Sequence, residues 1–316
     1  MQRRIWIVVA YTLLLVGVLP VAAQTPVPME FASQTDPASL IGSYYNAITL
    51  KDFPRAYSYW ESAPGNQTEA QFAAGFADTV SAQVLVQLPV FEDAGAGNVH
   101  ASIPTLVIAN RANGTQVYFA GCFITHKTNV PVGNATEPDP NWYLQSAKLK
   151  QQSTLNLTAL ATACQQPVSL MDGIVPQSQL DPLSTVTSYF TALATGQNST
   201  TYWEDPTYDV IYQTYGKELT HQLSLDLYVS PILDEEGAAG SAYATVPALV
   251  VLNGPDNSHS YLSACYTLRK SNVPVGNATE PDPNWHFTNA ALMQLGTDLS
   301  SAVNTITLNC FPEANH

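Results

Sequence analysis

The side chains with the clearest potential for chemistry lie in a 14-residue segment, NVPVGNATEPDPNW, at positions 129–142 that recurs unchanged at positions 272–285. In each copy, oxygen-bearing side chains alternate along a proline-stiffened stretch: Glu137, Asp139 and Asn141, then Glu280, Asp282 and Asn284. Oxygen ligands of this kind suit Ca²⁺. The segment lacks the length, the glycine turn and the closing glutamate of a known calcium loop. Calcium is therefore one interpretation, beside a binding surface displayed twice and homogenisation of the two copies without functional meaning.

Four cysteines flank these segments with matching spacing. Cys122 and Cys265 precede the two copies at the same distance, and Cys164 and Cys310 follow them at nearly the same distance. The chain is therefore a tandem duplication, which among three possible pairings selects Cys122–Cys164 and Cys265–Cys310. Closing loops of this length would stabilise each repeat by about 4 kcal/mol in the chain-entropy model. A zinc site is disfavoured, because there is no CxxC spacing and the repeats share no histidine.

The beginning of the chain has the pattern of a secretory signal peptide over Met1–Ala23. A basic start precedes the apolar run Ile5–Val18, and small residues at positions 21–23 mark a cleavage site. The alternative is an uncleaved anchor, because Ile5–Ala23 is just long enough to span a bilayer. No second apolar run follows, so after cleavage we expect no transmembrane span and a secreted or cell-envelope location. An exported location also fits the even number of cysteines.

The composition restricts the partners. The 316 residues include only 11% charged residues and carry a formal net charge of −14, and loss of Arg3 and Arg4 with the signal peptide makes it more negative. Nucleic acids are disfavoured, because phosphate contacts need clustered lysine and arginine and the sequence has no basic run. The partner class is left open as a protein, a glycan or a small apolar ligand.

The duplication and the length predict two domains. The expected divisions are a signal peptide at 1–23, a flexible linker at 24–35, the first repeat at 36–164, a linker at 165–180, the second repeat at 181–310 and a tail at 311–316. Six Asn-x-Ser/Thr sequons, which matter only in a host that glycosylates asparagine, lie at Asn66, Asn113, Asn134, Asn156, Asn198 and Asn277.

Each repeat begins with helical patterns. Asp-Pro at 36–37 and again at 181–182 predicts a helix start, with aspartate as N-cap and proline at the first helical position. A short helix is expected at Phe53–Trp60. A third is expected at Glu69–Val80, with its counterpart near Tyr215–Leu223.

Period-two alternation then predicts four strands in each repeat. The expected strands are 82–91, 100–109, 116–127 and 142–149 in the first repeat, and 223–233, 242–252, 260–270 and 285–292 in the second. Pro104 and Pro247 fall inside two of these patterns and predict an edge strand or a bulge. Alternation directs Phe123 and Tyr266 towards the helices and Cys122 and Cys265 to the opposite face, so the cysteine-bearing tails should cover that face.

The order of helix, short helix, helix and a four-stranded antiparallel meander resembles the nuclear transport factor 2-like, or cystatin-like, superfamily. The matching stretches are YYNAITLKDFPRAYSYW, FAAGFADT, FAGCFITHK and WYLQSAKL. The resemblance implies an α+β fold with two tandem cones, each with a curved four-stranded sheet wrapped around helices, and it is greatest to exported bacterial envelope domains. The family contains isomerases, hydratases and non-catalytic binding domains, so fold alone does not fix function.

The resemblance implies that catalytic residues would lie in the mouth of a cone. The candidates are Asp78, His100, His126, Tyr44 and Tyr45, which align with His221, Tyr243, Arg269, Tyr189 and Phe190. No acid–base pair occurs in both repeats, and an enzyme using the first cone alone would use Asp78 with Tyr45. Trp60 and Trp203 would fill the cores or stack on a ligand.

The expected function is an exported, non-catalytic binding or envelope-associated module. The alternatives are a small-molecule-binding protein or an isomerase- or hydratase-like enzyme using the first cone, and a structural surface protein. An apolar cavity lined by tyrosine and tryptophan beside a buried Asp78 would favour the small-molecule alternative, whereas filled cones would favour the interaction module.

Overall fold

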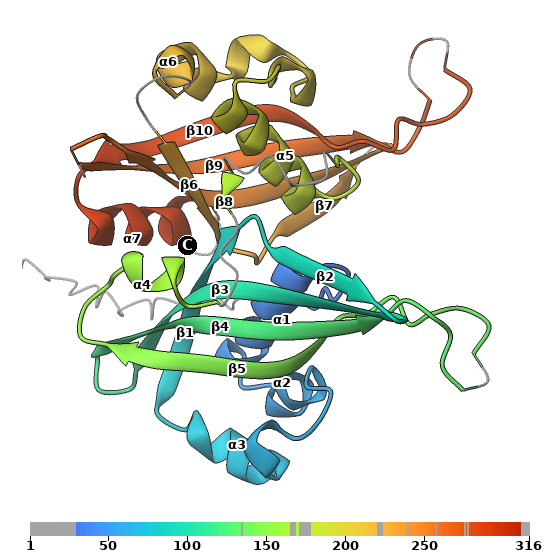
Figure 1. Cartoon of the computed structure of the whole chain (residues 1–316), viewed down its shortest axis with the longest axis vertical. Helices are drawn as coiled ribbons and strands as arrows, with labels where there is room; N and C mark the ends of the chain where they lie inside the picture. Colours follow the sequence, from blue (N-terminus) through green and yellow to red (C-terminus); the bar gives the residue numbers. More distant parts are fainter. Residues whose placement is uncertain are drawn as a thin grey trace, which may run out of the picture.

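The computed structural model describes residues 30–310 except 134, 165–168, 171–177, 220–223, 239, 257, 275 and 277. The predicted signal peptide, the predicted tail, parts of both linkers and His221 lie outside the described residues. The fold is α+β, with several helices around one large antiparallel sheet (Figure 1). Within the described part of the chain, no helix is long and apolar enough to cross a membrane.

Both repeats follow the same order of elements. The first contains α1 (Pro37–Thr49), α2 (Phe53–Ser58), a 3-10 turn (Pro64–Asn66), α3 (Glu69–Gly75), β1 (Thr79–Leu88), β2 (Phe91–Gly95), β3 (Asn98–Arg111), β4 (Gln116–Thr128), β5 (Tyr143–Gln152) and α4 (Thr158–Ala161). The second contains α5 (Pro182–Thr195), 3-10 turns (Thr200–Tyr202 and Pro206–Tyr208), α6 (Val210–Leu219), β6 (Ser224–Val229), β7 (Asp234–Ala238), β8 (Ser241–Asn253), β9 (His259–Ser271), β10 (His286–Gly296) and α7 (Leu299–Asn309).

The first helix of each repeat begins where the sequence predicts. The Asp36 carboxylate accepts hydrogen bonds from the backbone amides of Ala38 and Ser39, at 2.9 and 2.8 Å. The Asp181 carboxylate accepts from the Ser184 amide at 2.8 Å. These bonds satisfy amides that have no partner inside the helix, which fixes both helix starts.

The third helix is shorter than predicted. It ends at Gly75, and β1 begins at Thr79, which pairs with Arg111 of β3. The spacing of Phe72, Phe76 and Val80 fits a helix, but Val80 lies on the strand with its side chain exposed. Long-range strand pairing therefore overrides a local helical pattern here.

The two repeats share one ten-stranded sheet and do not form a separate four-stranded sheet each. The strand order is β10-β9-β8-β6-β1-β3-β4-β5, with β2 beside β3 and β7 beside β8. β1 and β6 pair antiparallel, with Val86 opposite Val229. These valines occupy equivalent positions in the two repeats, so an approximate two-fold axis passes between them. The pairing covers the edge that the first strand of each repeat would otherwise leave open.

The predicted first strands, 82–91 and 223–233, end early, and each is followed by a short additional strand, which also accounts for the prolines. β1 ends at Leu88 and β2 begins at Phe91, and both pair with β3, so Pro104 lies opposite the gap between them. In the second repeat, Ser230 lies in the corresponding gap, and its amide donates to the Pro247 carbonyl at 3.0 Å. The predicted edge strand or bulge is therefore wrong: β3 and β8 are interior strands, and each proline sits where the neighbouring strand is interrupted.

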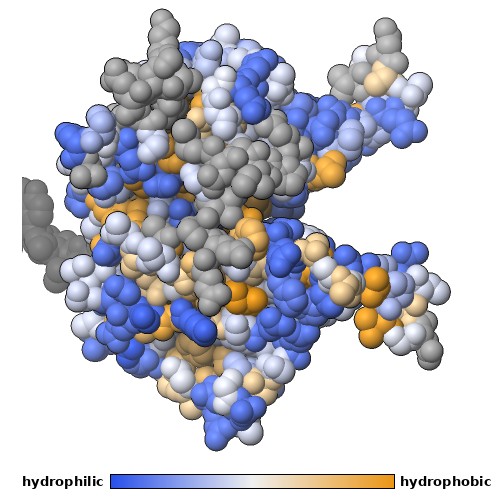
Figure 2. Space-filling view, viewed as in Figure 1, coloured by the Kyte–Doolittle hydropathy of each residue, from blue (hydrophilic) through white to orange (hydrophobic). Residues whose placement is uncertain are grey.

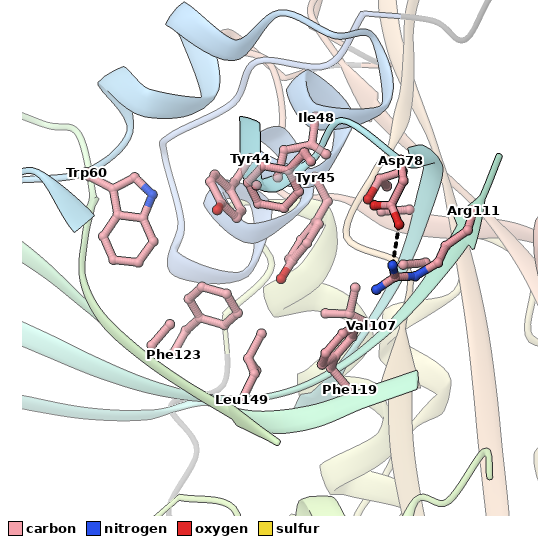
Figure 3. A pocket seen from close by; sticks show the side chains of 16 residues that line it. Tyr44, Tyr45, Ile48, Trp60, Asp78, Val107, Arg111, Phe119, Phe123 and Leu149 are labelled. Carbon is pink, nitrogen blue, oxygen red and sulfur yellow. Dashed lines mark hydrogen bonds and ion pairs between the residues drawn. The ribbon is translucent and has the colours of Figure 1, made fainter. Parts of the chain in front are cut away.

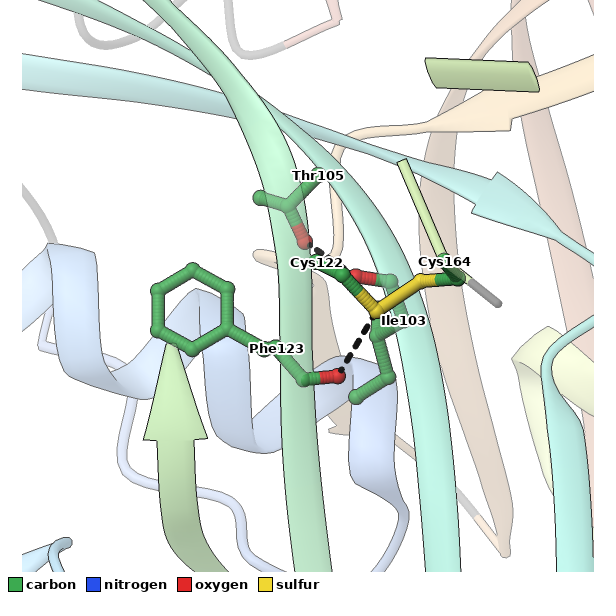
Figure 4. The surroundings of a disulfide bond; sticks show 5 residues. All are labelled: Ile103, Thr105, Cys122, Phe123 and Cys164. Carbon is green, nitrogen blue, oxygen red and sulfur yellow. Dashed lines mark hydrogen bonds between the residues drawn. A yellow bond between two sulfur atoms is a disulfide. The ribbon is translucent and has the colours of Figure 1, made fainter. Parts of the chain in front are cut away.

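A buried core packs against each face of the sheet. The main core lies between the sheet and α1 and α5, and it contains Phe123 and Tyr266, as the alternation predicts. A smaller core on the opposite face packs α4 and α7 against the sheet. Disulfides join Cys122 to Cys164 and Cys265 to Cys310, the pairs that the repeat alignment selects, with Cα–Cα distances of 5.1 and 5.4 Å (Figure 4 shows the first). The tails therefore cover the face that the main helices leave bare.

A glycine in α1 allows the two repeats to pack closely. A Cβ atom on Gly42 would lie 2.5 Å from the carbonyl oxygen of Pro231, in the connection between β6 and β7. Any side chain at position 42 would push this connection away from α1. The first helix of the first repeat is thus fitted to the second repeat as well as to its own sheet.

Candidate functional site

The first repeat contains a pocket of about 300 Å³ between α1 and the inner face of the sheet (Figure 3). Its lining is mostly apolar and comes from Tyr44, Tyr45, Ile48, Trp60, Gly75, Phe76, Asp78, Thr79, Ala82, Val107, Ala109, Arg111, Phe119, Phe123, Ala147 and Leu149. Trp60 lies at one end of the pocket and the Asp78–Arg111 pair at the other. The volume is at the lower end of the range for small-molecule sites.

The aromatic part of the lining is held by mutual contacts. Tyr44 and Tyr45 are adjacent on α1, and each packs edge-on against Phe123 of β4, with ring centroids 6.2 and 6.1 Å apart. Tyr44 also packs edge-on against Trp60 at 5.9 Å. Edge-to-face contacts of this kind stabilise one arrangement of the rings, so the pocket is bounded by a preorganised wall.

Tyr45 contributes a polar group to this apolar space. Its side chain is only 5% exposed, and burial raises the pKa of its phenol well above the usual value. Figure 3 shows the ring pointing from α1 into the pocket. No hydrogen bond joins its hydroxyl to another residue in the part of the chain that the structure describes. The hydroxyl therefore remains neutral and is available to a ligand.

The ion pair of Asp78 and Arg111 closes the other end of the pocket. Asp78 follows α3 and Arg111 ends β3, and the backbone amide of Ala112 donates to the Asp78 carbonyl at 2.8 Å, which joins the two segments. The side chains are 52% and 35% exposed. Asp78 and Tyr45 thus line the same pocket, but the Asp78 carboxylate is exposed and engaged by a guanidinium.

The histidines predicted near the cone mouth do not line this pocket. His100 and His126 stack with centroids 4.8 Å apart, and the two ring nitrogens of His126 lie 2.8 Å from Glu61 Oε1 and Asn98 Oδ1. Arg269, which replaces His126 in the second repeat, makes an ion pair with Glu204, the counterpart of Glu61. This position therefore carries a shared structural contact, through a histidine in the first repeat and an arginine in the second.

The corresponding interior of the second repeat contains four large rings in mutual contact. Tyr189, Phe190, Tyr266 and Phe287 are all fully buried. The Phe287 ring lies 5.0 Å from Tyr189 and 5.4 Å from Tyr266, and stacks on Trp203 at 4.9 Å. Phe287 occupies the position of Leu144 in the first repeat, so a ring stands where the first repeat has an aliphatic side chain.

The second repeat also holds a buried carboxyl group that the sequence analysis missed. The Tyr189 hydroxyl donates to Asp209 Oδ1 at 2.5 Å, and the Tyr212 amide donates to the same oxygen at 3.0 Å. Burial raises the pKa of Asp209, and these hydrogen bonds lower it in part. The sequence signal that could have revealed Asp209 is its spacing from Tyr212, which fits a helix N-cap. Asp209 had no counterpart in the first repeat, so comparison of the repeats could not reveal it.

The identical segments form two arms that project from the same side of the molecule (Figure 2). They connect β4 to β5 and β9 to β10, as expected. Both are anchored alike: the side-chain amides of Gln34 and Gln179 donate to the carbonyls of Trp142 and Trp285, each at 2.9 Å. Lysine ammonium groups lie over both indole rings, 4.9 and 5.2 Å from the centroids. The bases of both arms are therefore held in the same way.

The proposed calcium ligands are occupied by the arms themselves. Asp139 accepts from the Asn141 amide at 3.0 Å and from the Tyr143 hydroxyl at 2.9 Å. Asp282 accepts from the Asn284 amide at 2.9 Å and lies 3.1 Å from a ring nitrogen of His286. Glu137 and Glu280 are exposed. Over the described residues, no three His, Cys, Asp or Glu side chains are grouped closely enough to hold a metal ion.

No protein-family model, curated protein or solved structure matches this chain.

Proposed function

We propose that this chain is an exported, non-catalytic binding protein whose first repeat holds a small, mostly apolar molecule. In this proposal each repeat is a cone-shaped domain of the nuclear transport factor 2-like type, and the second repeat serves as a structural partner. Export is supported by the predicted signal peptide and by the two disulfides, which are typical of oxidising compartments.

The observation that carries the proposal is the pocket itself. It offers about 300 Å³ lined by aromatic and aliphatic side chains, with the buried Tyr45 hydroxyl to orient a ligand. Binding sites for small molecules have this combination of a mostly apolar wall and a few polar groups. The edge-to-face ring contacts hold the wall in place, which lowers the conformational cost of binding.

Binding is favoured over catalysis by the state of Asp78. A general base of this kind is usually buried, so that desolvation brings its pKa towards neutrality. Asp78 is more than half exposed and is paired with Arg111, so the lining of the pocket has no buried, unpaired carboxylate. The alternative of an isomerase- or hydratase-like enzyme requires one.

A neutral fluorescent probe tests this proposal. N-phenyl-1-naphthylamine is apolar and brightens on leaving water, and we expect one molecule to bind per chain. Val107→Phe places a ring in the pocket and should abolish binding, because Val107 lines it. Val80→Phe is the matched control, since Val80 is 54% exposed on the neighbouring strand β1, and it should bind the probe normally. Equal binding by both variants, or no binding by the unmodified protein, would refute the proposal.

A further inference from the structure

A second pocket adjoins the first at the end marked by Trp60. It has a volume of about 420 Å³ and lies between the segment after α2 and the middle of β5. Its lining consists of Trp60, Ser62, Ala63, Pro64, Gly65, Gln67, Gln145, Ser146 and Ala147. The lining contains no charged side chain, in contrast to the opposite end of the inner pocket, where Asp78 and Arg111 lie. We call it the outer pocket.

The inner and outer pockets share two residues, Trp60 and Ala147. The Trp60 backbone is fixed by a bridge to Leu144 at the start of β5. Its indole ring packs edge-on against Tyr44, and its N–H is buried on the protein side. One small residue and one indole therefore separate an apolar space from a polar one.

The outer pocket has the chemistry of a site for a hydroxyl-rich, uncharged group. Ser62, Gln145 and Ser146 offer hydroxyl and amide groups that make no side-chain hydrogen bonds to other described residues. Hydroxyls and amides both donate and accept, as sugar hydroxyls do. The indole of Trp60 supplies a flat apolar surface beside them. Anionic head groups are disfavoured by the net charge of −14.

We infer that the ligand is an uncharged amphiphile, with its apolar part in the inner pocket and a sugar-like head in the outer pocket. This inference rests on the proposed function, because it uses the inner pocket as the site of the apolar part. Trp60 then contacts both parts of the ligand, and Tyr45 hydrogen-bonds any polar atom within the apolar part.

Three probes of equal chain length test the inference: n-octyl β-D-glucoside, 1-octanol and octanoate, each titrated below its micellar concentration or solubility limit and followed by calorimetry. The glucoside should bind at least tenfold more tightly than the other two. The double variant Gln145→Ala/Ser146→Ala should weaken glucoside binding about tenfold, and should leave binding of N-phenyl-1-naphthylamine unchanged because its changes lie outside the inner pocket.

The outcomes separate the two proposals. If the naphthylamine binds but the glucoside binds no more tightly than octanol, the inference is wrong and the proposed function stands. Tighter binding of octanoate than of glucoside would also overturn the inference, in favour of an anionic ligand. If the naphthylamine and all three amphiphiles fail to bind, both proposals are wrong.

Discussion

The two repeats differ most in their interiors and least in their arms. The first encloses a pocket between α1 and the sheet. The aligned interior of the second contains four fully buried rings and a tyrosine–aspartate hydrogen bond. The arms, in contrast, are identical in sequence and anchored by the same glutamine and lysine contacts. The two repeats therefore share their arms but differ in the side chains that pack beneath the sheet.

The shared sheet explains why this difference is possible. The repeats meet through β1 and β6, and Gly42 of α1 packs against the connection beside β6. The buried core is continuous between the two repeats. An apolar cavity lowers stability because its lining loses contacts, so the continuous core supports the strands around the pocket of the first repeat.

The comparison is tested most strongly by adding the same bulk to both interiors. Val107 faces Phe119, and Val250, which occupies the equivalent position, faces Leu262. Val250 is fully buried among close-packed neighbours, so Val250→Phe should lower the free energy of unfolding by about 1–3 kcal/mol through overpacking. Val107→Phe enters the pocket and should change it by less than about 1 kcal/mol. Urea denaturation followed by circular dichroism measures both.

The relative stability losses of the two variants test this comparison. A larger loss for Val107→Phe than for Val250→Phe would mean that the first repeat is the more tightly packed one. The comparison would then be reversed, and the pocket would not be a preformed site.

The buried tyrosines give a second, smaller contrast. Tyr189 donates to the buried Asp209, so Tyr189→Phe leaves that carboxyl group without its partner and should cost about 1–3 kcal/mol. At the aligned position of the first repeat, no carboxylate among the described residues accepts from Tyr44. Tyr44→Phe should therefore cost less than about 1 kcal/mol. Thermal unfolding of the two variants, compared at one pH, measures the difference, and equal losses would contradict it.

Much of the fold can be predicted from the sequence, because the same sequence patterns occur in both repeats. The shared Asp-Pro pairs locate α1 and α5, and the shared cysteine spacing gives the disulfide pairs. The alternation around Phe123 and Tyr266 gives the buried face of the sheet. Each of these signals is local, or becomes so when the repeats are aligned.

The errors concern contacts that no local pattern contains. The joining of the repeats depends on Val86 meeting Val229, two residues far apart in the chain. The early end of α3 depends on Thr79 pairing with Arg111. The site is affected in the same way: Asp78 was predicted from the family resemblance, but its partner Arg111 lies on another element. The volume beside Tyr45 depends on side chains from five elements, so no single stretch of sequence reports it.

A third prediction concerns the helix N-cap Asp36 and the dependence of stability on pH. The pKa of Asp36 is raised to about 6, mainly by burial and also by the nearby Asp181 carboxylate, while hydrogen bonds from Ser39 lower it in part. Between the ordinary value of 3.8 and about 6, the folded protein binds a proton that the unfolded chain has lost. Stability from this group is therefore present at low pH and is lost as the pH rises through 6. Burial also raises the pKa of Glu92 and Glu235, with the same sign.

The expected result is a protein that is more stable at pH 5 than at pH 7, with a contribution from Asp36 on the order of 1 kcal/mol. Asp36→Asn keeps a good N-cap and removes the titration, so its free energy of unfolding should fall less between pH 5 and pH 7 than that of the unmodified protein. Denaturant titrations of both proteins at the two pH values give the difference. Equal pH dependence would show that the Asp36 carboxyl is solvated, and that the Asp181 carboxylate is too distant or too well screened to influence it.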